Sequence, residues 1–413
     1  MKILFTTASV CPQCKTRIPA SYIQYDNVVT LKKFCPEHGS FETDVWRGEG
    51  FLDWCGDWRP ETSDNPDCPD KCGLCENHKT MTCCALLDIT NRCNLQCAFC
   101  FANGGEGIDM PLEEAYAALD DMYEKGIRYI HISGGEPTVH PDLIAIIRYA
   151  SEKGFVYIQL NTNGLKIAED LTFAEQLQQA GTSCVFLQFD GMEDDVFERV
   201  RGEKLLSTKR KAIANCDKAQ LGVVLVPTII EGINDNQIGS IIRFAYDNMP
   251  AIRGVHFQPV TYTGRYKKGQ HYTIPEMLSV IETQTNGLIL KKQIQSSACD
   301  APLCGFHVEY RREGDVLHLL QADTGCCCCG ESSDVLKNQL HVKNRWTRVP
   351  DGDYEEGSFA ALRKQLSDQS FFVSGMMFQD LDNLDFGRTR YCSVHVYQKG
   401  SVIPFCVYHN LYH

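Results

Sequence analysis

The fold of this chain is decided by the stretch CNLQCAFC at residues 93–100, which follows the short apolar run ALLDIT at 85–90. Its three cysteines, Cys93, Cys97 and Cys100, stand at spacings of four and three. Three thiolates do not fill a four-cysteine iron–sulfur site, so one iron keeps an open position. An open iron can take a chelating ligand from outside the protein. A zinc site or an ordinary ferredoxin loop is the alternative interpretation of the same spacing.

Alternating strands and helices extend outward from this motif. Besides the strand at 85–90, apolar strands are predicted at 129–133, 155–160, 184–189, 222–228 and 254–258. Helical periodicity lies between them, at 110–126, 140–154, 170–180, within 194–218 and at 235–248. This alternation predicts parallel βα units, too few for a closed eight-fold barrel. We therefore expect an α/β fold, a partial (β/α)6 TIM-like barrel with an N-terminal metal-knuckle module and a C-terminal iron–sulfur extension.

Cysteine is the unusual residue in the composition. The chain has 413 residues and 22 cysteines, which fits either a disulfide-rich secreted protein or a thiolate–metal protein. After Met1 and Lys2 only the short apolar run ILF follows, whereas a signal peptide needs a longer apolar core. No apolar run reaches the length of a membrane span. We expect a cytoplasmic protein whose reduced cysteines bind metal.

The charge balance limits the class of partner. Lys and Arg total 40 against 53 Asp and Glu, a net charge of −13, and no basic run is present. Such a chain is a poor candidate for general nucleic-acid binding or for attraction to an anionic membrane.

The cysteines are concentrated at the two ends of the chain. Between Cys100 and Cys299 only Cys184 and Cys216 occur, and we expect both to be core residues. A disulfide framework would not leave this gap, whereas a catalytic domain between metal-binding extensions would. The predicted units are a rubredoxin-like or zinc-knuckle-like module at 1–58, an auxiliary cluster segment at 59–84, the barrel at 85–290 and an auxiliary iron–sulfur domain at 291–413.

The cysteine triad, with Phe99 before its last cysteine, resembles the radical S-adenosylmethionine (SAM) superfamily. In that family the open iron of a [4Fe–4S] cluster binds SAM, and the reduced cluster releases a 5′-deoxyadenosyl radical that abstracts hydrogen. The segment Gly134-Gly135-Glu136-Pro137 follows the second strand, as the family's SAM-binding GGEP segment does. The resemblance implies cofactor contacts from these four residues and from Phe99, Asn161, Thr162, Gln188, Asp190 and Gln258. The polar residues among them follow strands, at the edge where active sites of parallel barrels form.

Longer stretches, among them CPDKCGLCENHKTMTCCALLDITNRCNLQCAFCFAN and VHFQPVTYTGR, are similar to one subfamily over most of residues 8–305. It contains archaeal tetraether lipid synthase and a related methanogen pterin methyltransferase. The resemblance implies C–C bond formation or methylation of a lipid or small molecule, and an external electron donor such as flavodoxin or ferredoxin. A lipid substrate would bring some contact with a membrane surface. Modification of a peptide and a non-catalytic iron–sulfur redox or scaffold protein are the alternatives.

No catalytic residue is assigned from the sequence. His131 and His140 flank the glycine turn, and Tyr262 and Arg265 follow the sixth strand. These four residues are candidates for proton donors or substrate contacts, although each also suits a structural role.

The N-terminal knuckles predict a mononuclear metal site. Cys11-Pro-Gln-Cys14 and Cys35-Pro-Glu-His38 supply three thiolates, and the fourth ligand is His38 or Cys55. Such a site suits zinc or a rubredoxin-like iron. The resemblance favours iron, because the related lipid synthase carries a rubredoxin-like iron in this position.

One or two auxiliary [4Fe–4S] clusters are predicted from the remaining cysteines. Cys68, Cys72 and Cys75 repeat the spacing of the central triad, and Cys83 or Cys84 would close that site. Cys299, Cys304, Cys392 and Cys406 would form another. The run Cys326–Cys329 has no assigned role, and it leaves the C-terminal ligand set open because one or two of its members can replace Cys392 or Cys406.

Overall fold

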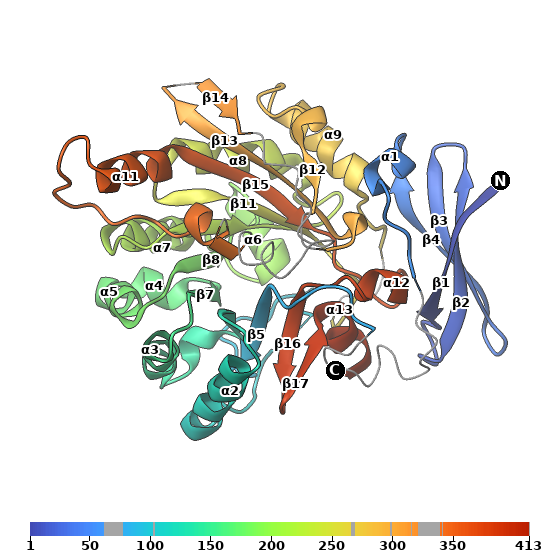
Figure 1. The fold of residues 1–413 in the computed structure, drawn as a ribbon, viewed down its shortest axis with the longest axis horizontal. Helices are drawn as coiled ribbons and strands as arrows, with labels where there is room; N and C mark the ends of the chain where they lie inside the picture. The colour runs from blue at the N-terminus through green and yellow to red at the C-terminus, as the bar shows by residue number, and fades with distance from the viewer. Residues whose placement is uncertain are drawn as a thin grey trace.

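The computed structural model describes residues 1–61, 77–101, 104–265, 269–297, 300–314, 316–320, 339–340 and 342–412 (Figure 1). Two β-sheets organise these residues, one at the N-terminus and one through the rest of the chain. None of the described helices is long and apolar enough to cross a membrane.

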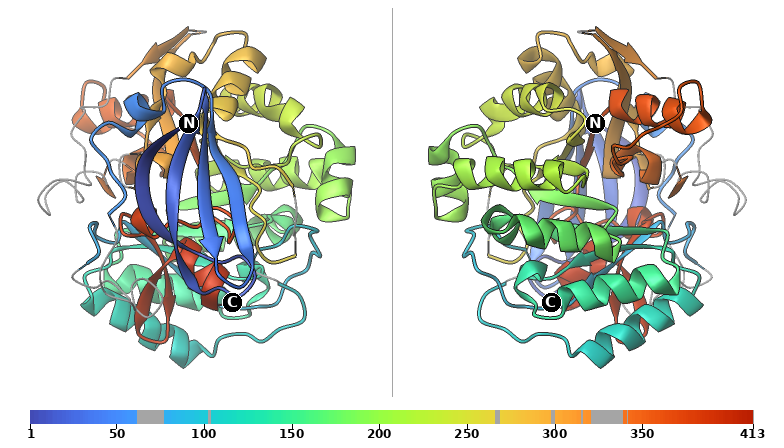
Figure 2. Two further views of the ribbon diagram at one scale, coloured as in Figure 1. Left: turned by 90° about the vertical axis from the view of Figure 1, so that its right-hand side faces the viewer. Right: turned by 90° about the vertical axis from the view of Figure 1, so that its left-hand side faces the viewer.

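The N-terminal sheet is antiparallel and contains four strands in chain order. These are β1 (Lys2–Val10), β2 (Arg17–Tyr25), β3 (Val28–Cys35) and β4 (Gly39–Arg47), followed by the short helix α1 (Phe51–Cys55). Alternating residues face inward along these strands, and Tyr22 and Trp46 pack against Phe51 of α1. The left view of Figure 2 shows the four strands crossing one side of the molecule.

The second sheet contains the predicted barrel. Six parallel strands occur where the sequence predicts them: β5 (Cys84–Asp88), β6 (Tyr129–Ser133), β7 (Tyr157–Thr162), β8 (Cys184–Gln188), β9 (Val223–Val226) and β11 (Ile252–Pro259). A two-residue strand, β10 (Thr228–Ile229), also pairs with β11. The expected α/β partial barrel is therefore confirmed.

Amphipathic helices cover the outside of the barrel sheet. The principal ones are α2 (Leu112–Glu124), α3 (Leu143–Lys153), α5 (Leu171–Ala180), α7 (Leu206–Lys218), α8 (Ile238–Asp247) and α9 (Ile274–Gln284), and shorter ones are α4 (Leu165–Glu169) and α6 (Asp194–Arg201). Their apolar faces, such as Leu119 and Met122 of α2, are fully buried in the same core as the strands. Gly154 ends α3 with φ of 106°, a left-handed conformation that favours glycine.

Two strands from the end of the chain extend the parallel sheet on both sides. β15 (Ser370–Met376) pairs in parallel with β11, and β16 (Val394–Gln398) pairs in parallel with β5. Beyond these strands the pairing is antiparallel. β13 (Gly305–Glu313) pairs with β15, and β12 (Gln295–Ser296) and β14 (Val316–Leu319) pair with β13. β17 (Ser401–Pro404) pairs with β16. The β13–β14 and β16–β17 pairs are antiparallel hairpins.

The remaining elements are short. They are the helices α11 (Phe359–Gln369), α12 (Phe386–Thr389) and α13 (Phe405–Val407), the 3-10 turns at Pro137–Val139, Asp235–Gln237, Lys291–Gln293 and Pro302–Cys304, and a π-helix at Tyr408–Tyr412.

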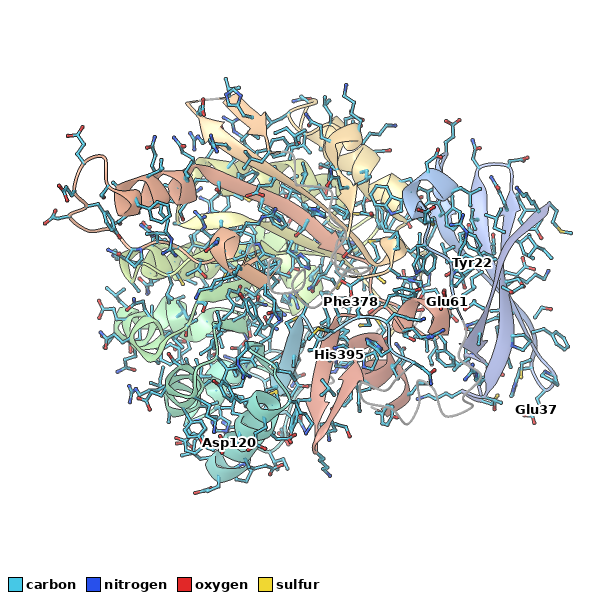
Figure 3. The ribbon with its side chains drawn as sticks, in the orientation of Figure 1. Tyr22, Glu37, Glu61, Asp120, Phe378 and His395 are labelled. Atoms are coloured by element: carbon cyan, nitrogen blue, oxygen red, sulfur yellow. The ribbon has the colours of Figure 1, made fainter. Side chains whose placement is uncertain are left out.

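Buried polar contacts attach the N-terminal sheet to the C-terminal segment. The Lys33 side chain is 2% exposed and donates from Nζ to Ser9 Oγ at 3.1 Å and to the Leu381 carbonyl at 2.6 Å. The Tyr22 hydroxyl donates to the buried carboxylate of Asp385. Figure 3 places Tyr22 on the inner part of this sheet and Glu37 at its far tip.

Candidate active site and metal centres

The cysteine loop and the glycine turn form one backbone unit. The Gly135 amide donates to the Thr90 carbonyl at 2.7 Å, and the Glu136 amide donates to the Arg92 carbonyl at 2.8 Å. A Cβ at Gly135 would lie 2.3 Å from the Arg92 carbonyl oxygen. Gly134 has φ of +135° and is equally tight against Thr90. Only glycine lets the end of β6 approach the loop that follows β5 this closely.

A cavity of about 1200 Å³ opens at this unit. Eleven of the predicted cluster and cofactor residues line it: Cys93, Cys97, Cys100, Phe99, Gly134, Gly135, Glu136, Asn161, Thr162, Gln188 and Gln258. They come from the loop after β5 and from the ends of β6, β7, β8 and β11, as expected for the carboxyl edge of a parallel barrel. The structure therefore brings these residues together around one space.

The three thiols suit a three-cysteine iron–sulfur cluster. Cys97 is 7% exposed, Cys93 and Cys100 are half-buried, and all three face the cavity. Burial raises the pKa of the Cys93 thiol to about 11. The raised pKa means that burial favours the neutral thiol of Cys93 in the absence of metal. Bound iron would favour the thiolate instead, because thiolate is the form that ligates iron.

Sequence reasoning missed Arg201, the last residue of α6. Its Nη1 lies 3.4 Å from Cys97 Sγ, and its guanidinium lies over the Phe99 ring at 4.7 Å. The side chain is 3% exposed, so this charge is out of reach of bulk water. A guanidinium in this position can donate a hydrogen bond to the Cys97 sulfur.

Asp190 holds Arg201 rather than facing the cavity. Its carboxylate accepts from Arg201 Nε at 2.7 Å and Nη2 at 2.9 Å, and also from the Thr228 amide at 3.0 Å. Asp190 is fully buried and does not line the cavity. Pro137, in the turn after Glu136, is buried and does not line it either. Asp190 follows β8 and Arg201 ends α6, eleven residues later. No local pattern in the sequence indicates that these two residues form an ion pair.

Glu136 connects the ends of two strands. Its buried carboxylate accepts from the Thr138 hydroxyl at 2.6 Å, from the Thr162 hydroxyl at 2.6 Å and from the Asn163 amide at 2.7 Å. Asn163 Nδ2 in turn donates to Asn94 Oδ1 in the cysteine loop at 2.7 Å. The carboxylate therefore sets the geometry of the edge at which a cofactor would bind.

Four residues were candidates for proton donors or substrate contacts. One of them lines the cavity, and the other three make structural hydrogen bonds. His131 lines the cavity. His140 is buried between the Met110 carbonyl and the Asp142 amide, and the Tyr262 hydroxyl donates to the Gln270 carbonyl at 2.7 Å. Arg265 donates from Nη1 to the Cys97 carbonyl at 3.3 Å and from Nη2 to the Gly104 carbonyl, so it holds the cysteine loop.

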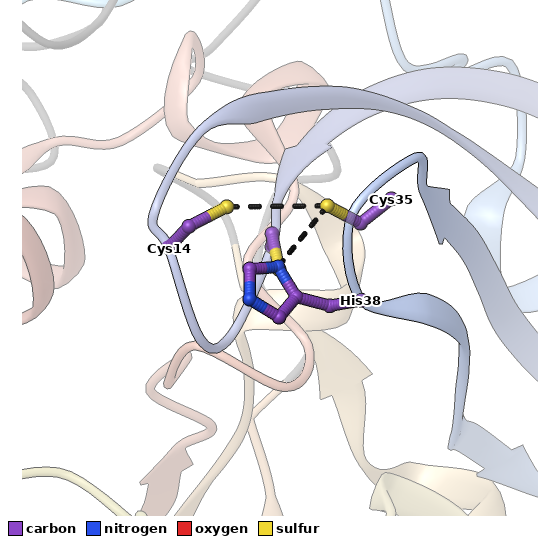
Figure 4. A group of neighbouring side chains, drawn as sticks. Cys14, Cys35 and His38 are labelled. Carbon is purple, nitrogen blue, oxygen red and sulfur yellow. Dashed lines mark hydrogen bonds between the residues drawn. The ribbon is translucent and has the colours of Figure 1, made fainter.

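The N-terminal knuckles form a compact site of three cysteines and one histidine. The ligand atoms of Cys11, Cys14, Cys35 and His38 all lie within 4.8 Å of one another. Cys14 Sγ is 3.9 Å from Cys35 Sγ, and His38 Nδ1 is 3.5 Å from Cys35 Sγ (Figure 4). Of the two fourth ligands left open by the sequence, the structure brings in His38, while Cys55 is buried on α1 outside this group. This donor set suits tetrahedral zinc.

Three C-terminal cysteines lie near one another at a second position. Burial raises the pKa of the Cys392 thiol well above its usual range, and the nearby Asp300, Cys406 and Cys304 raise it further. Arg388 Nη2 lies 3.5 Å from Cys304 Sγ, and the Gln379 amide lies 3.2 Å from Cys406 Sγ.

The other cysteines are accounted for in part. Cys83 and Cys84 line the large cavity. Cys184 and Cys216 are fully buried in the core. The remaining predicted ligands, Cys68, Cys72, Cys75 and Cys299, and the run Cys326–Cys329 lie outside the described residues.

Comparison with known proteins agrees with this geometry. Residues 87–245 match the model of the radical SAM superfamily. The matched stretch contains the cysteine triad and the glycine turn. Proteins of that superfamily use SAM and a [4Fe–4S] cluster, the cofactors that the sequence predicts here. Residues 3–47 match the HMPTM N-terminal zinc ribbon domain, and we call this sheet the zinc ribbon below.

Among similar curated proteins is the 7,8-dihydro-6-hydroxymethylpterin dimethyltransferase of Methanocaldococcus jannaschii, 38% identical over 315 residues. That match covers 72% of this chain and 62% of the methanogen protein. The GTP 3′,8-cyclase of Geobacter sulfurreducens is 26% identical over 253 residues, 59% of this chain and 73% of the cyclase. The crystal structure of Streptococcus suis SuiB bound to precursor peptide SuiA aligns with a TM-score of 0.43 at 19% identity, covering 50% of this chain and 46% of SuiB.

Proposed function

We propose that this enzyme modifies an unactivated carbon of a pterin-like small molecule, by C-methylation or another C–C bond-forming step. The observation that carries the proposal is the meeting of Cys93, Cys97 and Cys100 with the Gly134–Gly135 turn at one cavity. The methanogen pterin dimethyltransferase supports both the reaction class and the substrate class, and the matching zinc ribbon extends the similarity to the N-terminus.

The charges around the cavity favour a small uncharged substrate. Among the described lining residues the cations are Arg201 and Arg345, and each is paired with a carboxylate, Asp190 at 2.7 Å and Glu309 at 2.5 Å. A nucleoside triphosphate would need cations that are free to neutralise it. A lipid chain would offer no hydrogen-bond partner to a polar side chain such as His131 that faces the cavity. Both substrates are therefore less well supported than a heterocycle.

The residues of the chain position the reactants. When bound, SAM and the cluster supply a 5′-deoxyadenosyl radical that abstracts hydrogen from substrate carbon. Cys93, Cys97 and Cys100 would hold the cluster, and the Gly134–Gly135 turn lets ligand atoms approach the backbone. Arg201 would donate a hydrogen bond to the sulfur of the Cys97 ligand. Walls that keep water from the reacting carbon would protect a reactive radical from side reactions.

The other metal sites are part of the proposal. We expect zinc at Cys11, Cys14, Cys35 and His38, because the zinc-ribbon match supports zinc over the iron favoured from the sequence. We expect two auxiliary [4Fe–4S] clusters that exchange electrons with a flavodoxin or ferredoxin. The ligands of one would be Cys299, Cys304, Cys392 and Cys406, and those of the other Cys68, Cys72 and Cys75 with Cys83 or Cys84. Reduced clusters of this kind fit the predicted cytoplasmic location. Iron analysis of anaerobic protein should find about 12 irons for three cubane clusters, and only about four would remove both auxiliary sites.

One assay tests the function directly. Anaerobically reconstituted protein is reduced and supplied with SAM, a separate one-carbon donor as the source of the methyl carbon, and 7,8-dihydro-6-hydroxymethylpterin, and products are followed by mass spectrometry. We expect 5′-deoxyadenosine and a methylated pterin from the wild type and neither from the triple Cys93→Ala, Cys97→Ala, Cys100→Ala variant. 5′-Deoxyadenosine without pterin consumption would refute the substrate class. No 5′-deoxyadenosine from protein with intact clusters would instead favour the non-catalytic scaffold.

A further inference from the structure

A row of hydrogen-bonded side chains lines the inner wall of the large cavity, below the glycine turn. It runs across β6 and β7 through His131, Tyr157, Gln159 and Asn161, all of which face the cavity. Gln159 and Tyr157 are fully buried. His131 precedes Ser133, the last residue of β6, by two positions, so it lies roughly 7 Å deeper in the barrel than the strand end.

The contacts of Gln159 fix the direction of every hydrogen bond in this row. The Tyr157 hydroxyl lies 3.2 Å from Gln159 Oε1 and must donate, because an amide oxygen only accepts. Gln159 Nε2 then donates to Asn161 Oδ1 at 2.8 Å and to His131 Nδ1 at 3.3 Å. A neutral imidazole that accepts at Nδ1 carries its proton at Nε2. His131 therefore holds an N–H donor for which the described residues supply no protein acceptor.

His131 and the neighbouring His256 are neutral groups. Burial lowers the pKa of His131 to about 3, with a further contribution from His256. Burial lowers the pKa of His256 to about 4, and its Nδ1 lies 2.8 Å from the Ser374 hydroxyl. The two histidines thus offer hydrogen bonds without charge at neutral pH.

Phe186 gives the same wall an aromatic surface. Its ring centroid lies 4.9 Å from Trp346, 5.5 Å from His256 and 6.3 Å from His131. Offset rings of this kind favour a flat, conjugated ligand. An anionic ligand would find both described cations of the cavity lining, Arg201 and Arg345, already paired with carboxylates, whereas a heterocycle with ring nitrogens or a carbonyl would satisfy the donor.

We propose that His131, oriented by Gln159, donates a hydrogen bond to an acceptor atom of an uncharged planar heterocycle lying against Phe186. This inference deepens the proposed function and rests on it for the substrate class. His131 and Phe186 touch the substrate, whereas Gln159 acts through His131 and is a positioning residue.

Equilibrium binding to the reconstituted holoenzyme with SAM present tests this assignment. The probe is 7,8-dihydro-6-hydroxymethylpterin, with GTP as the charged comparison. We expect His131→Phe to weaken pterin binding about tenfold, the effect of one lost hydrogen bond in a cavity, and Gln159→Leu to weaken it severalfold. His131→Gln keeps an N–H donor and should restore most of the affinity. His318→Phe, on the exposed hairpin strand β14, is the matched control and should bind as the wild type does.

Two further measurements separate a binding role from misfolding and from failure of the proposed function. SAM affinity and the thermal midpoint of His131→Phe should equal those of the wild type. Unchanged pterin affinity in His131→Phe, or tighter binding of GTP than of pterin, would overturn the inference. If pterin binding depends on His131 but the wild type makes no methylated product, the proposed function fails while this recognition role stands.

Discussion

Replacing Asp190 by Asn tests whether the Asp190–Arg201 pair is a structural support of the active site. The substitution keeps the shape of the side chain but removes the charge that faces Arg201. Both side chains are at most 3% exposed, so the guanidinium would remain buried without its counter-charge. Breaking a buried ion pair in this way typically costs about 3–5 kcal/mol in the free energy of unfolding.

This cost can be expressed as a shift in the thermal midpoint. A chain of 413 residues has an unfolding entropy of about 0.9 kcal/mol per kelvin if it unfolds cooperatively, so the midpoint should fall by about 3–6 K. The control is Asp247→Asn, which breaks the exposed Arg243–Asp247 pair, at 65% and 49% exposure, and should cost about 0–1 kcal/mol. Differential scanning calorimetry of the holoprotein measures both.

The double variant Asp190→Asn with Arg201→Met sharpens the test. With the buried charge gone, it should lose less stability than the two single variants added together, because the cost lies in the unpaired charge. The reasoning would be refuted if Asp190→Asn shifted the midpoint no more than Asp247→Asn does. Strict additivity in the double variant would refute it as well.

Three further predictions concern the turn, the ribbon and one strand. Gly135→Ala should abolish SAM binding in equilibrium dialysis while the cluster absorbance persists, because its Cβ would lie 2.3 Å from the Arg92 carbonyl oxygen; retained SAM affinity would contradict the close-approach explanation. Cys14→Ser should reduce zinc by about one ion per chain in elemental analysis without lowering iron, since one tetrahedral site needs all four ligands; a matching loss of iron would instead favour a rubredoxin-like centre. Burial raises the pKa of Asp88 on β5 to about 6, so its protonated form is favoured in the folded state and its contribution to stability falls as pH rises from about 4 to 6. Asp88→Asn should remove this pH dependence in urea titrations, and an unchanged profile would place the titrating group elsewhere.

The sequence was sufficient for the centre of the fold. The six strands of the barrel were predictable because each is a short apolar run bounded by a turn and followed by a helix of the correct length. The cysteine triad was predictable because its spacing suits three ligands of one iron–sulfur cluster. The glycine turn was predictable because two adjacent glycines after a strand allow two backbone segments to approach closely.

The edges of the barrel were not predictable, because strand pairing over long range leaves no local pattern. SVHVYQ has the same alternation whether it forms an isolated hairpin or also pairs with β5, as β16 does. The contact between Arg201 and Cys97 was not predictable for a similar reason, since no residue near Arg201 in the sequence indicates that its side chain reaches Cys97. The choice between His38 and Cys55 required the turn that brings His38 back toward Cys35.

The pairing of β5 with β16 has a consequence for how the polypeptide matures during translation. β5 carries the cysteine loop, yet one of its edges is covered only by a strand that begins at Val394, about 310 residues later in the chain. At a synthesis rate of about 5–20 residues per second, the nascent β5 waits roughly 15–60 seconds for that neighbour to be made. During this interval its unpaired amides and carbonyls are a template for wrong partners. Insertion of iron and sulfide should therefore be most productive after release from the ribosome, and a chaperone that covers this edge would raise the yield of loaded enzyme.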